Sequence, residues 1–166
     1  MKLKDLLKDV EDVELTPEQE KQIKDYLGIK GNKRWKPKNG EDYYYLDSCL
    51  TINEATFRQN NIDYSRIASY NCFNTAKEAN FAIEKYKVYQ ELKLFAEENN
   101  DPIDWKKTIE KKWTFYYDYL EKNLIISDYC HICHFGTIYF SSLELAEQAA
   151  DKVGRNRIKK YLFGVE

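Results

Sequence analysis

Two stretches of this chain carry the same succession of features, and that repetition limits the folds open to it. An aromatic run opens each stretch, Tyr43–Tyr45 in the first and Phe115–Tyr117 in the second. A phenylalanine followed by polar residues comes next, Phe73-Asn74-Thr75 and then Phe140-Ser141-Ser142, and an alanine-rich amphipathic segment follows each of them. A succession that recurs at this spacing indicates two copies of one supersecondary unit.

Each unit is predicted to begin with strands. Short runs rich in aromatic and β-branched residues, separated by polar turns, are typical of antiparallel strands. In the first unit the expected strands are Tyr43–Leu46, Leu50–Phe57 and Arg66–Phe73, with Arg58–Ser65 as the turn before the last. In the second unit they are Trp113–Tyr117, Leu124–Ser127 and Cys130–Phe140, the last broken at Gly136.

The segment from 75 to 98 is the clearest predicted helix. Thr75 with Glu78 forms a capping box, and Asn99-Asn100-Asp101-Pro102 ends the pattern. Its apolar arc is far wider than that of a surface helix, because it includes Ala79, Ala82, Ile83, Tyr86, Tyr89 and Ala96 together with Phe81, Val88, Leu92 and Phe95. A second helix of the same chain, a second copy of the chain or a partner must cover it. We therefore expect a homodimer.

A later helix is predicted from Leu143 to Val153, where Leu143, Ala146, Ala150 and Val153 form one narrow stripe. Gly154 interrupts it, and Arg155–Leu162 is expected to form a last short helical segment. The fold class predicted from these elements is α+β. Two tandem β-β-β-α units, residues 43–100 and 101–166, would form one antiparallel sheet with the helices packed on one side.

The N-terminal part differs from the repeats. Residues 1–28 are predicted to form a short helical arm, in which Thr16-Pro17-Glu18-Gln19 begins the second helix and Gly28 ends it. The arm is locally acidic, through residues that include Glu11, Asp12, Glu14, Glu18 and Glu20. Residues 29–42 are dense in Gly, Pro and Asn-Gly signals and are predicted to form a basic loop.

Composition excludes several classes of protein. No apolar run approaches the roughly 20 residues of a membrane span, and the N-terminus is too acidic for a secretion signal. A formal net charge of −2 argues against coating nucleic acid by bulk charge. Cys49, Cys72, Cys130 and Cys133 are expected to be reduced thiols in a cytoplasm.

The segment Tyr129-Cys130-His131-Ile132-Cys133-His134 is the weak candidate for a metal site. If it is a strand, Cys130 and His134 share one face while His131 and Cys133 share the other. Cys49 and Cys72 would have to converge on it to complete a ligand set, so no metal is predicted. A nucleophilic Cys–His pair is disfavoured too, because neighbouring residues on one strand do not face each other.

The sequence carries no other catalytic signature. There is no phosphate-binding loop, no dinucleotide fingerprint and no nucleophile elbow. No pair of carboxylates lies in apolar sequence of the kind that raises a pKa. We therefore predict a protein that is not an enzyme and that has no cofactor.

Two basic clusters and the aromatic residues supply the candidate binding residues. Aromatics make up 15% of the chain, with 14 Tyr, 8 Phe and 3 Trp. These rings could line a twisted sheet or anchor a partner. The basic residues could track a phosphate backbone, or they could be loop and helix-end charges balanced by acids. The candidates are Arg34, Trp35, Lys36, Lys38, Tyr43, Tyr45, Phe81, Val88, Leu92, Phe95, Arg155 and Arg157.

Several segments resemble small accessory proteins of phages and prophages in low-GC Gram-positive bacteria. The resemblance covers roughly three quarters of the chain and lies in the aromatic strands and capped helices, not in site motifs. It implies a phage origin and carries over no catalytic residue. The matching segments are 34–35 leading to 43–47, 73–79 continuing to 96–99, 115–119, 138–142 and the tail 157–166.

Three functions follow as hypotheses. Accessory phage proteins of this size often block a host defence system, so we expect an inhibitor, anti-CRISPR-like or otherwise anti-defence, acting in the host cytoplasm. It would bind a bacterial defence protein or ribonucleoprotein through aromatic anchors. The first alternative is a nucleic-acid-binding accessory protein that uses Trp35 with its basic neighbours and Arg155–Lys160. The second is a sponge for a defence signalling nucleotide, with pockets between subunits.

Overall fold

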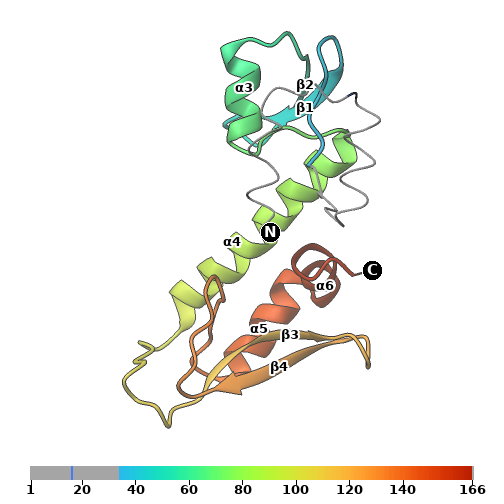
Figure 1. The fold of residues 1–166 in the computed structure, drawn as a ribbon. Coiled ribbons are helices and arrows are strands. Elements are labelled where there is room, and N and C mark those ends of the chain that lie inside the picture. Colours follow the sequence, from blue (N-terminus) through green and yellow to red (C-terminus); the bar gives the residue numbers. More distant parts are fainter. Residues whose placement is uncertain (1–15, 17–33, 166) are drawn as a thin grey trace, which may run out of the picture. The chain divides into compact units, whose positions relative to one another are not determined.

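The computed structural model describes Thr16 and residues 34–165. The chain divides into two compact units, residues 1–35 and 36–166, so nearly all described residues lie in the second. The elements, in chain order, are β1 (Asp42–Leu46), β2 (Ile52–Thr56), α3 (Asn61–Ala68), α4 (Ala76–Asn99), β3 (Lys112–Asp118), β4 (Asn123–Tyr129), α5 (Leu143–Val153) and α6 (Arg155–Leu162) (Figure 1). The predicted α+β class is confirmed.

Strands pair in two hairpins. β1 and β2 are antiparallel, with Tyr44 opposite Glu54, and β3 and β4 are antiparallel, with Phe115 opposite Ile126. In each hairpin, one residue from later in the chain pairs with the edge of the first strand that faces away from the second strand. Tyr44 exchanges two backbone hydrogen bonds of 2.9 Å with Phe73, and Trp113 exchanges bonds of 2.9 and 2.8 Å with Phe140.

The third strand predicted for each unit is wrong. Where Arg66–Phe73 was expected to be a strand, Arg66–Ala68 is the end of α3 and only Phe73 bridges to β1. The segment Cys130–Phe140 is a loop with turns at Gly136, and only Phe140 bridges to β3. In both places the structure has a single bridging residue, whereas the sequence predicted a whole strand.

The single large sheet predicted from the two units is not present among the described strands. They form two separate two-stranded sheets, β1–β2 and β3–β4. The helices instead provide much of the packing. α5 packs on β3 and β4, while α4 contacts β1 and β2 and also α5 and α6.

The wide apolar arc of α4 is covered within one chain. Thr75 caps the helix by accepting a hydrogen bond from the Glu78 amide, and the helix then runs for 24 residues. Val88 and Leu92 are 0% and 1% exposed. Because α5 and α6 supply the cover, the sequence feature that suggested a homodimer is accounted for by packing inside the chain.

The main core lies between α4, α5, α6 and the β3–β4 hairpin. α5 contributes small residues, and Ala146, Ala149 and Ala150 are all fully buried, which lets this helix approach its neighbours closely. Phe140 is also fully buried, against Phe95 and Phe115. The core is made up of Val88, Leu92, Phe95, Ala96, Leu124, Phe140, Ala146, Ala149, Ala150, Val153 and Ile158.

A buried polar cluster fastens α3 to β1. The Tyr43 hydroxyl donates to an Asp63 carboxylate oxygen at 2.8 Å, and Arg66 Nη1 donates to the Tyr43 oxygen at 2.8 Å. The Arg66 guanidinium lies 3.4 Å from the centre of the Tyr45 ring. Asp63 also accepts the Arg58 amide at 2.8 Å. These contacts satisfy a carboxylate that is only 2% exposed.

The N-terminal predictions are covered only in part. Within the predicted arm 1–28, Thr16 alone is described, and it is exposed. The rest of that arm lies outside the described residues. Within the predicted basic loop 29–42, residues 34–41 form neither helix nor strand, and a turn at Asn39-Gly40 leads into β1.

Candidate functional site

The outer face of the β3–β4 hairpin carries a row of aromatic side chains. Alternate residues of a strand point to opposite faces, and in this pair Phe115 and Ile126 pack against the core. The opposite face therefore belongs to Tyr116 and Ile125, which are directly paired, and to Tyr129. The local sequence Phe115-Tyr116-Tyr117-Asp118-Tyr119 keeps both faces aromatic.

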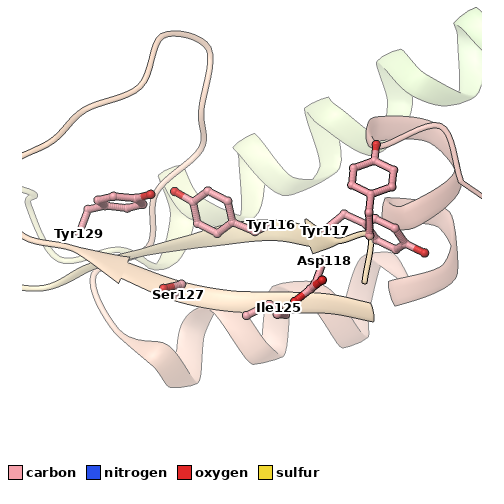
Figure 2. A pocket seen from close by; sticks show the side chains of 7 residues that line it. Tyr116, Tyr117, Asp118, Ile125, Ser127 and Tyr129 are labelled. Atoms are coloured by element: carbon pink, nitrogen blue, oxygen red, sulfur yellow. The ribbon is translucent and has the colours of Figure 1, made fainter. Parts of the chain in front are cut away.

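Seven residues of this hairpin line a shallow groove of about 450 Å³, and Figure 2 shows their side chains. They are Tyr116, Tyr117, Asp118, Tyr119, Ile125, Ser127 and Tyr129. We call it the tyrosine groove. Four aromatic rings and one aliphatic side chain supply its apolar surface. Its polar groups are the hydroxyls of the four tyrosines and Ser127 and the carboxylate of Asp118.

Tyr116 and Tyr129 form one end of the tyrosine groove. Their ring centres are 5.7 Å apart, and Figure 2 shows the two hydroxyls pointing towards each other. The Tyr116 hydroxyl is buried, and the group that it faces among the described residues is the Tyr129 hydroxyl. Burial, and after it a side-chain hydrogen bond with Tyr129, raises the pKa of Tyr116 far above its ordinary value. This hydroxyl therefore stays protonated, and its place beside Tyr129 keeps it out of contact with solvent.

Tyr117 and Tyr119 form the other end. Their ring centres are 5.0 Å apart at an interplanar angle of 80°, and the Tyr117 ring lies 6.1 Å from Phe163. Tyr119 is 69% exposed, although its hydroxyl reaches the Phe163 carbonyl at 3.5 Å. This end thus presents an accessible ring that the α6 terminus supports from one side.

Asp118 is the one charged residue among the seven that line the groove. Its Oδ1 accepts the amides of Leu120 and Glu121 at 2.8 and 3.1 Å, which holds the turn between the two strands. That leaves its second oxygen available to a ligand. The groove consequently has negative character and no cationic side chain in its lining.

The loop that follows β4 borders the tyrosine groove. The His134 ring lies 5.0 Å from the Tyr129 ring, and the His134 amide donates to the Tyr139 hydroxyl at 2.9 Å. Phe135, next to His134, is fully exposed. An aromatic side chain at a loop tip beside an aromatic groove enlarges the apolar surface that a partner could cover.

Four of the predicted binding residues lie in the interior. Tyr43 and Val88 are fully buried, Leu92 is 1% exposed and Phe95 is 7% exposed. Their prediction as anchors for a partner is therefore corrected, because they pack inside the chain. Tyr45 is half-buried under Arg66, while Phe81 is 37% exposed and its ring lies 5.2 Å from that of Tyr161.

The predicted basic residues divide into two groups. Arg155 pairs with Glu147 and Asp151, and Arg157 makes two hydrogen bonds with Glu91, at 2.7 and 3.0 Å. These two guanidinium groups are thus neutralised by neighbouring carboxylates. In the other group Arg34, Lys36 and Lys38 are exposed and Trp35 is half-buried.

The weak metal candidate does not lie on a strand. Cys130 is half-buried and His134 is exposed, and both belong to the loop after β4. The alternation of faces that separated the Cys and His residues in the sequence argument does not apply to a loop. Within residues 34–165 no cluster of three or more His, Cys, Asp or Glu side chains is arranged to hold a metal ion.

Sequence reasoning missed the tyrosine groove, which shares no residue with the predicted binding set. The sequence did contain a signal for an outward-facing aromatic row. Tyr116 alternates with the core-facing Phe115, and Tyr129 pairs across the hairpin with Lys112, which lies on the same face as Tyr116. Recognising that required the register of β3 against β4, which the turn at residues 119–122 sets.

Among the described helices, none has both the length and the apolar character needed to cross a lipid bilayer. Comparison with known proteins finds no matching family, no matching curated protein and no matching solved structure. The surface of the chain is therefore the structural evidence that bears on its function.

Proposed function

We propose that this chain is a phage-encoded, non-enzymatic inhibitor that binds a bacterial defence protein or ribonucleoprotein in the host cytoplasm. The tyrosine groove is the observation that supports this proposal most directly. It gathers four tyrosines at one hairpin, with Tyr116 and Tyr129 on the face opposite the core and Tyr117 and Tyr119 at the turn end. Tyrosine is enriched in protein interfaces, because it buries a large rigid surface and keeps a polar group at its tip.

The geometry of the tyrosine groove favours a protein partner over a small substrate. The lining residues lie on a shallow surface, and only Asp118 among them is charged. The side chains that most often act as catalytic nucleophiles or bases are histidine, cysteine and lysine, and none of the seven lining residues is one of these. Exposed rings at the rim, among them Tyr119 and Phe135, can serve as anchors in a partner's surface.

The direction towards host defence, anti-CRISPR-like or otherwise, comes from the resemblance to phage accessory proteins. A phage gains from a small protein that blocks an immune complex by occupying its surface, and such a protein needs no catalytic machinery. The local acidity of residues 1–28 adds a way to engage a basic nucleic-acid channel on the target.

The structure offers less to the two alternatives. Arg155 and Arg157, which a nucleic-acid-binding protein would use, are already paired with carboxylates. The tyrosine groove lacks a cation to meet a phosphate. A nucleotide sponge needs pockets between subunits, and the apolar arc that suggested a second subunit is covered by α5 and α6.

The test begins with a tagged pull-down from nuclease-treated lysate of a defence-bearing Gram-positive host. Three proteins are compared: the unmodified chain, a Tyr119→Ala/Ile125→Ala double variant and a Tyr86→Ala control. Tyr119 and Ile125 line the tyrosine groove, whereas Tyr86 is an exposed tyrosine on α4. All three should unfold at closely similar urea concentrations, because each change removes a side chain that is at least 38% exposed.

We expect a defence protein to be recovered in near-equal amount with the unmodified chain and with Tyr86→Ala, and to be lost with the double variant. The purified pair should then form a complex that blocks the defence activity in vitro. Recovery of the same partner with the double variant would contradict the role of the groove. A bound nucleic acid or nucleotide, lost on substitution of Lys36 and Lys38, would instead support the alternatives.

A further inference from the structure

One long side of β4 has no partner strand. Among the described strands β4 pairs only with β3, in a regular antiparallel register that sets Asp128 opposite Trp113 and Ile126 opposite Phe115. The Trp113 amide and carbonyl bond to Phe140, on the side of β3 that faces away from β4. In an antiparallel ladder, opposite residues alternate between hydrogen-bonded and non-hydrogen-bonded pairs. Trp113 and Asp128 therefore form a pair without hydrogen bonds between them.

The amide and carbonyl groups of every second residue of β4 consequently point away from β3. These residues are Leu124, Ile126 and Asp128, and we call this side of the strand the β4 edge. The Leu124 amide supports this direction, because it donates to the Asn123 side chain at 2.9 Å and not to β3. In the part of the chain that the structure describes, the amides of Ile126 and Asp128 donate to no backbone carbonyl outside the hairpin. The β4 edge thus presents a row of donors and acceptors at the spacing of an extended strand.

The β4 edge also lacks the features that keep exposed strands from pairing with other chains. Protected edge strands are commonly very short or carry lysine, proline or a β-bulge. β4 has seven residues, its register with β3 contains no bulge, and its sequence Asn-Leu-Ile-Ile-Ser-Asp-Tyr contains no lysine, arginine, proline or glycine. Its one charged side chain, Asp128, pairs with Lys111 at 3.5 Å. No unpaired charge of β4 therefore opposes the approach of another strand.

The side chains that alternate with these backbone groups belong to the tyrosine groove. Ile125, Ser127 and Tyr129 project from the outer face of β4, and Ile125 is 38% exposed (Figure 2). Side chains that lie opposite each other on adjacent strands are close enough to pack, and aromatic and β-branched pairs stabilise a sheet most. A strand added at the β4 edge would place alternate side chains beside Ile125 and Tyr129, and so would extend the apolar surface of the groove.

We infer that the β4 edge receives an extended segment of the protein partner as an additional strand. The amides of Ile126 and Asp128 donate to carbonyl groups of that segment, and its amides donate to carbonyl groups of the β4 edge. In this mode of recognition the backbone hydrogen bonds supply affinity, and alternate side chains supply specificity. The segment carries uncharged, β-branched or aromatic residues beside Ile125 and Tyr129. This inference rests on the proposed function, since it names how the partner is held.

The first test measures hydrogen exchange by NMR in the full, isotope-labelled chain. Without a ligand, the amides of Ile126 and Asp128 should exchange fast, while those of Ile125 and Ser127, which point to β3, should exchange slowly. The probe is a capped peptide of alternating threonine and valine with a lysine at each end. Its analogue, N-methylated at every internal amide, keeps the side chains and removes the backbone donors. At saturation the first peptide should slow exchange at Ile126 and Asp128 at least about tenfold, and the analogue should leave it unchanged.

Two variants of one residue separate the backbone from the side chain. Asp128→Ala removes the carboxylate and keeps the amide, whereas Asp128→Pro removes both. Proline is tolerated in an edge strand where its nitrogen faces solvent, because no hydrogen bond of the sheet is lost. We expect Asp128→Ala to bind the peptide within about twofold of the unmodified chain, and Asp128→Pro at least about fivefold more weakly. If the proline variant does not fold, the exchange measurement with the two peptides still decides.

Five results would overturn the inference. They are slow exchange at Ile126 and Asp128 in the free chain, no binding of the first peptide, equal binding of its N-methylated analogue, equal binding by the two Asp128 variants, and a doubled molecular mass that Asp128→Pro returns to that of one chain. The last result would assign the β4 edge to a second copy of the chain.

The two proposals fail separately. If the pull-down partner depends on Tyr119 and Ile125 but is retained by Asp128→Pro, the proposed function stands and this inference falls. If the peptide pairs with the β4 edge but no defence protein is recovered, the edge stands as a surface that binds an extended strand, and the proposed function falls.

Discussion

Lys112 shows how one buried charge can organise several loops. Its side chain is on the groove side of β3 and the residue is 2% exposed. The ammonium donates to the carbonyl oxygens of Lys107 and Glu110, both at 2.7 Å, and of Cys130 at 3.2 Å. It also lies 5.6 Å from the centre of the Trp105 ring. One side chain thus joins the segment before β3 to the loop after β4.

Replacing Lys112 by Met should lower the free energy of unfolding by about 2–4 kcal/mol, because three carbonyl groups lose their donor in a buried place. Urea denaturation followed by circular dichroism measures this. The control is Lys106→Met, an exposed lysine in the same segment, which should change stability by about 0.5 kcal/mol or less. Equal effects of the two substitutions would show that the carbonyl contacts contribute little.

Asp63 gives the fold a defined response to acid. Burial alone would raise the pKa of Asp63. Hydrogen bonds from the Arg58 amide, the Tyr43 hydroxyl and the Asn60 amide, together with the Arg66 charge, outweigh burial and hold that pKa below its ordinary value. Below about pH 4, the unfolded chain therefore takes up a proton before the folded chain does. The stability that this carboxylate contributes is present above that pH and declines as the pH falls towards its folded-state pKa.

Asp63→Asn should lower the free energy of unfolding by about 2–4 kcal/mol at pH 7, because charge-assisted hydrogen bonds are lost. The difference between the two proteins should shrink as the pH is lowered from about 4. Urea denaturation at pH 7, 5, 4 and 3 gives both curves. Asp42→Asn, an exposed carboxylate on β1, is the control. A difference that stays constant down to pH 3 would contradict the depressed pKa of Asp63.

At the scale of elements, predictions succeeded where local signals act within one segment. α4 was predicted at residues 75–98 and runs from Ala76 to Asn99, because the Thr75 cap and the Asn-Asn-Asp-Pro sequence mark its ends without help from tertiary packing. α5 and α6 also form where the sequence predicts helices, because the spacing of their apolar residues is a local signal. Gly154 separates them with φ at 99°, a conformation that glycine adopts without a Cβ clash.

The same local rules explain α3, a helix at residues for which the sequence analysis predicts a turn and the start of a strand. Asn60 accepts the Asp63 amide, and the Asp63 carboxylate accepts the Asn60 amide at 3.3 Å, so the pair forms a capping box. That signal is readable in the sequence, but aspartate replaces the glutamate usually sought. Phe73 and Phe140 are different, because their single bridges depend on pairing with distant residues, which periodicity cannot reveal.

The contact between α6 and α4 allows a quantitative test of one predicted binding residue. Arg157 makes two hydrogen bonds with Glu91, and both side chains are more than a third exposed. Solvent screening limits such a pair, so a double-mutant cycle with Arg157→Gln and Glu91→Gln should give a coupling of about 0.5–1 kcal/mol. The exposed pair Lys93 and Glu97 on α4 is the control and should give about 0.2–0.5 kcal/mol. A coupling energy near zero between Arg157 and Glu91 would contradict the view that Glu91 neutralises this guanidinium.

At the scale of the whole molecule, predicting the tertiary arrangement requires knowing which element covers each apolar surface. The sequence shows that α4 has too wide an apolar arc for a surface helix, and it leaves open which element covers it. In the structure β1, β2, α5 and α6 share that role. The tyrosine groove could not be predicted for a related reason. Whether Tyr116 points into the core or outwards depends on the register of the hairpin and on where α5 packs.

This packing leads to an expectation for the oligomeric state. The apolar side chains of α4 that stay exposed are few among the described residues, namely Phe81, Tyr86 and Leu94, at 37%, 52% and 54%. Sedimentation equilibrium at tens of micromolar should therefore give the mass of one 19.8 kDa chain. A doubled mass would show that the homodimer expected from the sequence exists. Leu94→Lys would then decide where it forms, because a charge on α4 should dissociate a dimer built on that helix and should not affect one built through the tyrosine groove.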